Sequence, residues 1–316
     1  MLNFLYCLDE NYNKQCLNSI YSILNYSDIE CSFYIIHKEP NSLEPLNKKI
    51  LNHNNLKNFV VKEFNDSVLD FVNLEKVHVT EPSYYRLFMS NYVPKNIEKI
   101  IYIDPDVVCL KNFNDEILKN LKIMEDQNLN LAAVTEDPHE VDKDNAARLN
   151  LKSKKYFNAG VLIINLSNWR ELNIVKEFEN LLKINSNRLE LHDQDILNIF
   201  YDGNYLELDK GMNFTVPGGG EKYLKKIKEY KFENIKLIHY SGNKKPWQIK
   251  GILHEAGEHY REAYESLYQK KYHLSDSSKK KSFKLFTKMI IDKRLKELKY
   301  PYYFIFYFFR YLLKTK

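Results

Sequence analysis

The sequence predicts an α/β fold in which helices flank a mostly parallel central sheet, followed by a basic and aromatic helical C-terminal tail. Three observations support this prediction. Short apolar runs alternate with longer polar or amphipathic stretches, as in βαβ units. Several of these runs end in carboxylate, amide or imidazole side chains, which places polar groups at one edge of a sheet. After about Ser275 the composition changes to Lys, Ser, Phe and Tyr.

The first half of the chain supplies four predicted strands. These runs, rich in β-branched, aromatic and Leu residues, cover 1–7, 31–37, 56–64 and 97–103. Helices are expected over 14–26 and near 41–54, between the first three strands. The fourth strand runs directly into Asp104-Pro105-Asp106, and the apolar pattern resumes over 107–110. Two carboxylates are therefore expected at the end of a buried strand.

The second half continues the alternation. Further apolar strands are predicted over 131–135, 159–165 and 235–240. An amphipathic helix is predicted over 169–184. A second helix, over 193–201, begins with Asp193-Gln194, and a carboxylate suits the dipole of a helix N-terminus. The run Gly218-Gly219-Gly220 predicts a loop that can move.

Length and charge divide the chain into two predicted parts. A chain of 316 residues can form one large α/β domain over 1–275 and a separate tail over 276–316. From residue 277 onward there are twelve Lys and Arg against two acidic residues, so the tail carries +10 and the body −5. A negative body argues against a nucleic-acid-binding protein.

Cysteine usage and the N-terminus predict a cytoplasmic location. Cys7, Cys16, Cys31 and Cys109 have no CxxC spacing, so they predict reduced thiols rather than a zinc ribbon or a thioredoxin-like motif. The first residues have no basic segment, and Asp9 and Glu10 interrupt the apolar stretch. This is not the pattern of a secretory signal.

Three motifs can carry chemistry, and each also has an ordinary structural explanation. Asp104 and Asp106 can present hard oxygen ligands to one divalent ion, or they can be solvated turn residues. The segment 239–247 offers an imidazole, a glycine and lysines to a diphosphate, or it is a basic loop after a strand. The segment 156–165 places an amide at the start of a buried strand, where it can hydrogen-bond hydroxyls or merely form a turn before a core strand.

Six motifs that occur in a fixed order are more specific evidence for a protein family than any one of them alone. They are LDENY (8–12), YYRL (84–87), YIDPDVVCL (102–110), YFNAGVLIINLSNW (156–169), DQD (193–195) and HYSGNKKPW (239–247). Over roughly residues 1–250 the chain resembles glycosyltransferase family 8, the retaining sugar-nucleotide transferases that include bacterial lipooligosaccharide galactosyltransferases and glycogenin. The resemblance implies a GT-A type nucleotide-diphospho-sugar transferase fold.

The resemblance also implies roles for single residues. Asp104, Asp106 and His239 match ligands of Mn²⁺ or Mg²⁺. Nucleotide contacts are matched by Asp9, Asn11 and Tyr12. Sugar contacts are matched by Arg86, Asn158, Ala159 and Asp193. Diphosphate contacts are matched by Gly242 and Lys245. Gln194 matches the residue nearest the reacting sugar carbon. Because a carboxamide is a poor nucleophile, we expect departure of UDP and entry of the acceptor hydroxyl on the same face.

The composition of the tail predicts a binding partner that differs from the ligands of the body. The run 300–313 is aromatic, is interrupted by Arg310, and is too short for a spanning helix, which needs about 20 apolar residues. Aromatic rings with nearby lysines suit an anionic bilayer interface. We therefore expect peripheral association with the inner face of the cytoplasmic membrane. Burial against the body or against a dimer partner is the alternative.

The function expected from all these features is metal-dependent, retaining transfer of galactose or glucose from a UDP-sugar to a surface glycan, such as lipooligosaccharide or lipopolysaccharide core. Two alternatives stay open. One is a glucosyltransferase acting on a protein-linked glycan. The other is a non-catalytic sugar-nucleotide-binding or membrane-scaffold protein. No nucleic-acid partner is expected.

Overall fold

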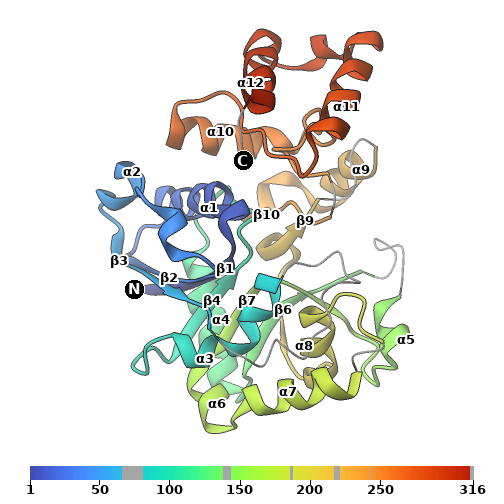
Figure 1. The fold of residues 1–316 in the computed structure, drawn as a ribbon. Helices are drawn as coiled ribbons and strands as arrows, with labels where there is room; N and C mark the ends of the chain where they lie inside the picture. Colours follow the sequence, from blue (N-terminus) through green and yellow to red (C-terminus); the bar gives the residue numbers. More distant parts are fainter. Residues whose placement is uncertain (66–80, 138–143, 186–187, 217–220, 243, 314–316) are drawn as a thin grey trace.

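A seven-stranded sheet forms the centre of the protein in the computed structural model, which describes residues 1–65, 81–137, 144–185, 188–216, 221–242 and 244–313 (Figure 1). Its strand order is β3-β2-β1-β4-β7-β6-β8. The strands are β1 (Leu2–Leu8), β2 (Cys31–His37), β3 (Leu56–Glu63), β4 (Lys99–Ile103), β6 (Leu131–Thr135), β7 (Phe157–Asn165) and β8 (Leu206–Glu207). Of these, β7 alone runs antiparallel to its neighbours. The mostly parallel α/β sheet expected from the sequence is thus confirmed.

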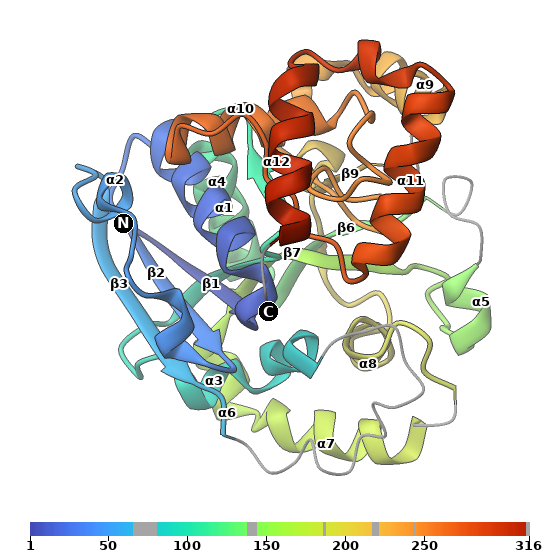
Figure 2. The same ribbon diagram turned by 45° about the horizontal axis from the view of Figure 1, so that its top comes forward.

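Helices cover both faces of this sheet, which explains why its strands are apolar on both sides (Figures 1 and 2). One face packs against α1 (Asn13–Tyr26), α2 (Lys48–Leu51) and α4 (Asn114–Asp126). The other face packs against the 3₁₀ helix η5 (Glu81–Phe88) and against α3 (Met89–Tyr92), α6 (Leu166–Glu171), α7 (Ile174–Asn185) and α8 (Asp193–Tyr201). A short helix α5 (Asn145–Leu149) precedes β7.

A small second sheet brings distant segments of the chain to the carboxyl edge of the first. It has the order β5-β10-β9, with β5 (Val107–Cys109), β9 (Phe214–Thr215) and β10 (Leu237–His239). Because β10 is antiparallel to β5, His239 pairs with Val107. This pairing places the imidazole beside Asp106, which the sequence separates from it by more than a hundred residues.

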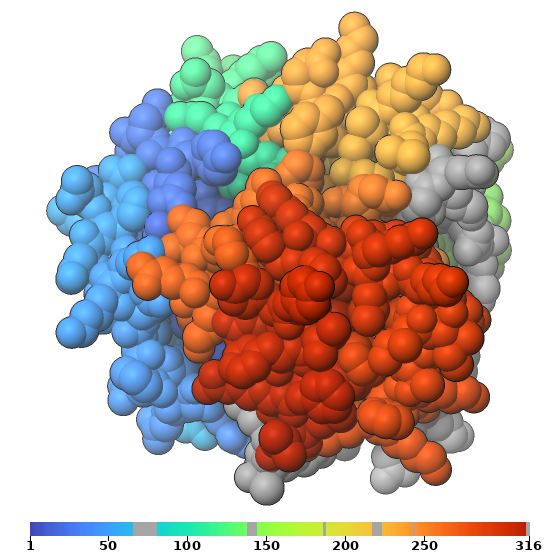
Figure 3. Space-filling view, turned by 90° about the horizontal axis from the view of Figure 1, so that it is seen from above, coloured from blue at the N-terminus to red at the C-terminus, as the bar shows by residue number. Residues whose placement is uncertain are grey.

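The C-terminal segment folds as helices at the end of the molecule opposite α6 and α7 (Figures 1 and 2). It follows α9 (Glu221–Tyr230) and α10 (Gly257–Tyr268), and contains α11 (Lys279–Ile291), the 3₁₀ helix η8 (Arg294–Glu297) and α12 (Pro301–Leu313). Phe286, Phe304 and Phe308 are buried with Ile249, Ile252 and Tyr272 in one hydrophobic cluster. The tail therefore contacts the segment just before it, and its helices form much of one face of the molecule (Figure 3).

Two predicted helices differ from those observed. The segment near 41–54 forms only a 3₁₀ turn at Pro40–Leu43 and the one-turn α2, because Pro45 lacks an amide donor and disfavours helix at the residue before it. The single helix predicted over 169–184 is two helices, α6 and α7. They separate at Asn173, whose φ of 49° is left-handed and which is one of the few residue types that adopt it readily.

Two further predictions concern the glycine loop and membrane crossing. The glycine run at 218–220 lies outside the described residues. Among the helices that the structure describes, none is long and apolar enough to cross a membrane. The predicted boundary between residues 275 and 276 stays a prediction.

Candidate functional site

Two carboxylates and an imidazole form a cluster at the carboxyl end of β4. Asp104 and Asp106 flank the turn between β4 and β5, and His239 ends β10. One ligand atom from each lies within 4.8 Å of the others. His239 Nε2 is 3.3 Å from Asp106 Oδ1 and 3.7 Å from Asp104 Oδ2. Oxygen and imidazole ligands at such separations suit a divalent cation.

Neighbouring amides fix which nitrogen of His239 faces the carboxylates. The Gly160 N–H donates to Asn158 Oδ1 (3.0 Å), so this oxygen must accept from Asn213 Nδ2 as well (2.8 Å). The other end of Asn213 is then its oxygen, which lies 3.0 Å from His239 Nδ1 and accepts its proton. In the neutral imidazole the lone pair is therefore on Nε2. This is how proteins prepare a histidine to bind a metal, so the residues present fit a divalent ion.

A glycine makes room for this imidazole. A Cβ added at Gly160 would lie 2.3 Å from His239 Cε1, far inside van der Waals contact. Gly160 is on β7, directly beside the amides that orient the ring. The strand can therefore pass behind His239 only because residue 160 has no side chain.

Arg86 joins the metal cluster to the start of α8. Its guanidinium donates to Asp104 Oδ1 (2.9 Å) and to Ala159 O (2.6 Å), and its Nε lies 3.0 Å from Asp193 Oδ2. Burial raises the pKa of Asp193 to about 6, and Arg86 opposes part of that rise. Tyr102 contacts both partners: its hydroxyl donates to Asp104 Oδ1 (2.6 Å), and its ring stacks against the Arg86 guanidinium.

Lys245 brings a positive charge to the opposite side of the cluster. Its ammonium forms an ion pair with Asp106 and donates to Tyr240 O (2.6 Å). Burial raises the pKa of the Asp106 carboxyl, but Lys245 and His239 outweigh it and hold that pKa well below its usual range. Burial likewise opposes the charge of Lys245, yet Asp106 leaves its pKa above the ordinary value. Both groups are therefore charged at neutral pH.

The sugar-contacting candidates lie along the first residues of β7 and α8. Gln194 Oε1 accepts from the Ala159 N–H (2.9 Å), which joins the two elements. Asn158 Nδ2 donates to Glu136 Oε1 (3.2 Å), and burial raises the pKa of this carboxyl. Asn158, Ala159, Asp193 and Gln194 thus lie together beside the Asp-Asp-His cluster, and their contact with a sugar stays a prediction.

The nucleotide-binding candidates end β1 and flank the loop after β10. Asp9 caps the 3₁₀ helix η1 (Glu10–Tyr12) by accepting from the Asn11 N–H (3.0 Å). The Tyr12 ring meets Trp247 edge-on, with centroids 6.0 Å apart. Gly242 has a φ of 80°, and a Cβ there would meet no atom of the described residues within 4 Å. Its left-handed backbone therefore borders open space, where a ligand could approach closely.

Four residues that sequence reasoning did not single out support this site: Tyr102, Glu136, Gly160 and Asn213. Glu136 comes directly after β6, so its position at a strand end was an available signal. Asn213 directly precedes the two-residue strand β9, and no pattern in the sequence predicts its contact with His239.

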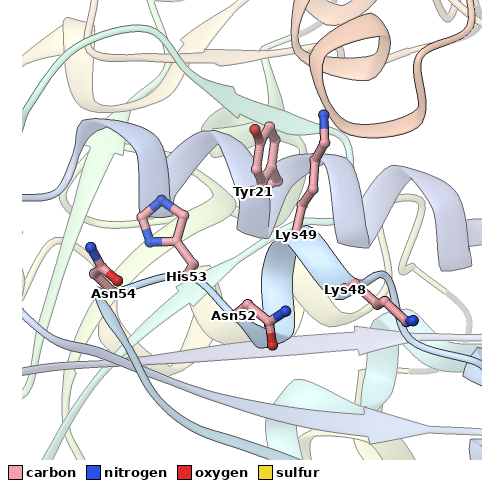
Figure 4. A pocket seen from close by; sticks show the side chains of 6 residues that line it. All are labelled: Tyr21, Lys48, Lys49, Asn52, His53 and Asn54. Atoms are coloured by element: carbon pink, nitrogen blue, oxygen red, sulfur yellow. The ribbon is translucent and has the colours of Figure 1, made fainter.

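An open hollow of about 440 Å³ lies elsewhere on the molecule. It is lined by Tyr21, Lys48, Lys49, Asn52, His53 and Asn54, from α1, α2 and the turn after α2 (Figure 4). None of the site residues described above lines it. The chemistry is therefore concentrated at the carboxyl edge of the sheet rather than in this hollow.

Comparison with known proteins agrees with this arrangement. The sequence model of glycosyl transferase family 8 matches residues 3–251, which include every residue of the cluster. The chain belongs to glycosyltransferase family 8. This confirms the family predicted from the six motifs.

Relatives of this family 8 protein include transferases with assigned substrates. A Haemophilus influenzae protein classed by name among the glycosyltransferases is 33% identical over 254 residues, covering 79% of this chain and 74% of its own. The lipopolysaccharide 1,2-glucosyltransferase of Escherichia coli K12 is 28% identical over 273 residues, covering 84% and 78%. The galactosyltransferase LgtC, crystallised with donor and acceptor sugar analogues, superposes with a TM-score of 0.70 at 20% identity, covering 84% and 96%. This last likeness shows the fold, which is of the GT-A type.

Proposed function

We propose that this family 8 protein is a metal-dependent, retaining hexosyltransferase that moves galactose or glucose from a UDP-sugar to a glycan of a surface lipid, such as lipooligosaccharide or lipopolysaccharide core. The observation that carries the proposal is the Asp104-Asp106-His239 cluster, with Lys245 on one side and Arg86 on the other. Such a cluster suits a sugar diphosphate, which combines several negative charges with a polar ring.

A divalent metal, Mn²⁺ or Mg²⁺, would be held by Asp104, Asp106 and His239. It would supply positive charge to the diphosphate as the leaving group becomes more negative. Asn213 keeps His239 Nε2 directed toward the two carboxylates, and Tyr102 with Arg86 holds Asp104. Lys245 would exchange its contact with Asp106 for a phosphate oxygen when the donor binds.

The sugar would be oriented by the polar groups on β7 and α8. Arg86, Asp193 and Asn158 can bond its hydroxyls, and Gln194 would lie on the face opposite the departing phosphate. The bond from the anomeric carbon to the UDP oxygen breaks. The acceptor oxygen then bonds to that carbon on the same face and gives its proton to the departing phosphate oxygen. Gln194 Oε1 would stabilise the positive charge that develops on the sugar.

The hexose and the acceptor are inferred from the relatives. The names of the Escherichia coli glucosyltransferase and of LgtC give glucose and galactose as the transferred sugars of those proteins, and the first acts on lipopolysaccharide. A bacterial surface glycan built at the cytoplasmic membrane fits a tail that can attach to that membrane.

The tail supports a location on the inner face of that membrane. Phe306 is 58% exposed, and Tyr302, Tyr303, Phe309 and Leu313 lie exposed along the same helix, α12. Lys280, Lys281, Lys284 and Lys288 are exposed on the adjoining α11. Exposed rings next to lysines match an anionic bilayer interface, in which rings lie among headgroups and lysines meet acidic lipids.

Donor turnover tests the proposal. UDP release would be measured with UDP-Gal, UDP-Glc, UDP-GlcNAc and UDP-GalNAc, with Mn²⁺ or with EDTA, and the anomer of any product would be assigned by NMR. We expect turnover of one hexose donor, loss of turnover in EDTA, and an α-linked product.

Other outcomes redirect the assignment. A β-linked product would contradict the retaining mechanism. Neither binding nor turnover of any UDP-hexose would contradict the enzyme assignment and favour a non-catalytic scaffold. Turnover that persists in EDTA would contradict the metal-holding role of Asp104, Asp106 and His239.

A further inference from the structure

Both ends of the Gln194 side chain are held by groups of fixed hydrogen-bonding character. Its Oε1 accepts from the Ala159 N–H at 2.9 Å, and that backbone group can only donate. Its Nε2 donates to the Tyr156 hydroxyl at 3.2 Å. The amide of Gln194 therefore has one orientation, with its oxygen toward β7.

The Tyr156 hydroxyl accepts from Gln194 because its own proton is already committed. It donates to Asp195 Oδ1 at 2.6 Å, an oxygen that also accepts from Arg148. Burial raises the pKa of Tyr156 far above its ordinary value, so the hydroxyl keeps its proton. If the amide of Gln194 turned over, two donors would face each other at Ala159 and two acceptors would face each other at Tyr156.

Asp195 is the fixed point of this arrangement. It is fully buried and accepts five hydrogen bonds. Arg148 donates to both oxygens, at 2.7 and 3.0 Å, in the bidentate geometry that gives guanidinium-carboxylate pairs their directional strength. The backbone N–H groups of Glu190 and Leu191 add two more, at 2.8 and 3.0 Å. These contacts fix the carboxylate in place and leave it no free edge toward the sugar site.

The elements that carry Ala159 and Gln194, β7 and α8, are joined by a second set of hydrogen bonds one turn further along α8. Asn198 Oδ1 accepts from the Phe157 N–H (2.8 Å), and its Nδ2 donates to Phe157 O (2.9 Å) and to Gln194 O (2.9 Å). The backbone of α8 is therefore fixed on β7 independently of Tyr156. Loss of the Tyr156 hydroxyl should loosen the amide end of the Gln194 side chain, which keeps its contacts with Ala159 and Glu136, without releasing the helix.

We propose that Arg148, Asp195 and Tyr156 are positioning residues for Gln194, and that together they set the orientation of its amide for sugar transfer. The proposal rests on the function proposed above, in which Gln194 lies next to the reacting carbon. It assigns Asp195 a supporting part, because a carboxylate that accepts five hydrogen bonds is not available to attack the sugar.

The test begins with Tyr156→Phe, which removes one hydroxyl from a side chain that is 4% exposed. The matched control is Tyr201→Phe, which is 5% exposed and loses an equivalent buried bond, from Trp169 Nε1 at 2.7 Å. We expect kcat of Tyr156→Phe to fall about 10- to 100-fold, as misplaced catalytic groups do. The donor KM should stay nearly unchanged, and so should donor affinity by calorimetry. Tyr201→Phe should keep its kcat while losing a similar amount of thermal stability.

A double-mutant cycle separates positioning from a structural effect. In a Gln194→Ala background there is no amide left to orient, so adding Tyr156→Phe should lower kcat no further. A residue that acted through general stability or through the shape of the site would lower kcat by the same factor in both backgrounds.

The possible results are distinct. A loss of kcat in Tyr156→Phe that disappears in the Gln194→Ala background supports the proposal. An additive loss, or a kcat equal to that of Tyr201→Phe, overturns it while leaving the transferase function standing. An unmutated protein that neither binds nor turns over any UDP-hexose overturns both.

Discussion

The carboxyl edge of the sheet and the C-terminal tail use charged and aromatic side chains in opposite ways. At the edge, Arg86 and Asp106 are buried and Lys245 is half-buried, and each contacts several polar partners. In the tail, Lys284 and Phe306 are exposed on helix surfaces. A ligand that reaches the edge meets groups already fixed in place, whereas the tail presents side chains that can adapt to a soft surface.

The difference has an energetic basis. Removing one member of a buried ion pair leaves the other charge without compensation, which costs about 3–5 kcal/mol. An exposed charge near a lipid surface contributes about 1 kcal/mol, and salt weakens it. Substitutions at the edge should therefore change both stability and chemistry, while substitutions of the exposed side chains of the tail should change only where the protein resides.

The largest effect is expected from Asp106→Asn. The variant loses a carboxylate of the cluster and leaves the buried ammonium of Lys245 without its ion pair. We expect metal-dependent turnover to fall by at least about 1,000-fold, because a metal contributes several kcal/mol to such reactions. Stability should fall by about 3 kcal/mol in calorimetry. Glu30→Gln, which breaks an exposed pair with Lys57, is the control and should change neither. Turnover within tenfold of the unmutated protein would contradict a role for Asp106 at the metal.

The next effect concerns pH. The folded-state pKa of Asp193, about 6, lies above the value of about 4 for an unfolded carboxyl, so folding favours the protonated form. This contribution is present below about pH 4 and is lost as pH rises through about 6. The unfolding free energy of the unmutated protein, relative to Asp193→Asn, should therefore fall by about 3 kcal/mol across that window. Urea unfolding at several pH values measures it.

The control for this pH effect is Asp202→Asn. Burial raises the pKa of Asp202, but the N–H groups of Ser153 and Lys152 outweigh it and lower the pKa overall. The relative stability should then change in the opposite direction, rising with pH. A flat difference for Asp193→Asn would show that Arg86 compensates the buried carboxylate fully.

A smaller effect is expected from Gly160→Ala. The new methyl would lie 2.3 Å from His239 Cε1, so the imidazole must move away from Asp104 and Asp106. We expect affinity for Mn²⁺ to fall about 10- to 100-fold, as it does when the residues that orient a ligand are changed. Calorimetric titration with Mn²⁺ measures this. Ile163→Val, a buried substitution on the same strand, should leave the affinity unchanged; equal affinities in all three proteins would mean that His239 is not a ligand.

Much of the fold could be predicted because its strands are buried on both faces. The runs at 31–37 and 131–135 and the helix at 193–201 have the predicted bounds. The prediction of one continuous helix near 41–54 was wrong, because Pro45 interrupts a polar segment that otherwise favours a helix. Periodicity also missed β8 and β9, since two-residue strands depend on their partners rather than on any pattern of their own.

The site could be predicted only as far as its residues lie at strand ends or in recognisable motifs. Asp104, Asp106 and His239 were proposed in this way, and the structure brings them together. Asn213 and Arg148 were not, because each acts through contacts with residues far along the chain. Such contacts depend on the pairing of β9 with β10 and on the packing of α5 near α8, which no local sequence pattern specifies.

The smallest effect tests the tail. Lys284 is exposed on α11, so Lys284→Gln should weaken binding to phosphatidylcholine vesicles that contain phosphatidylglycerol by about 1 kcal/mol, or roughly fivefold. Cosedimentation at low and high salt measures this, and the difference should shrink as salt rises. Turnover of a soluble acceptor should not change, because the residue lies outside the site. Lys62→Gln, an exposed lysine of β3, is the control. If both variants weaken binding equally, or if neutral vesicles bind as well as acidic ones, the lysines of α11 do not recognise an anionic surface.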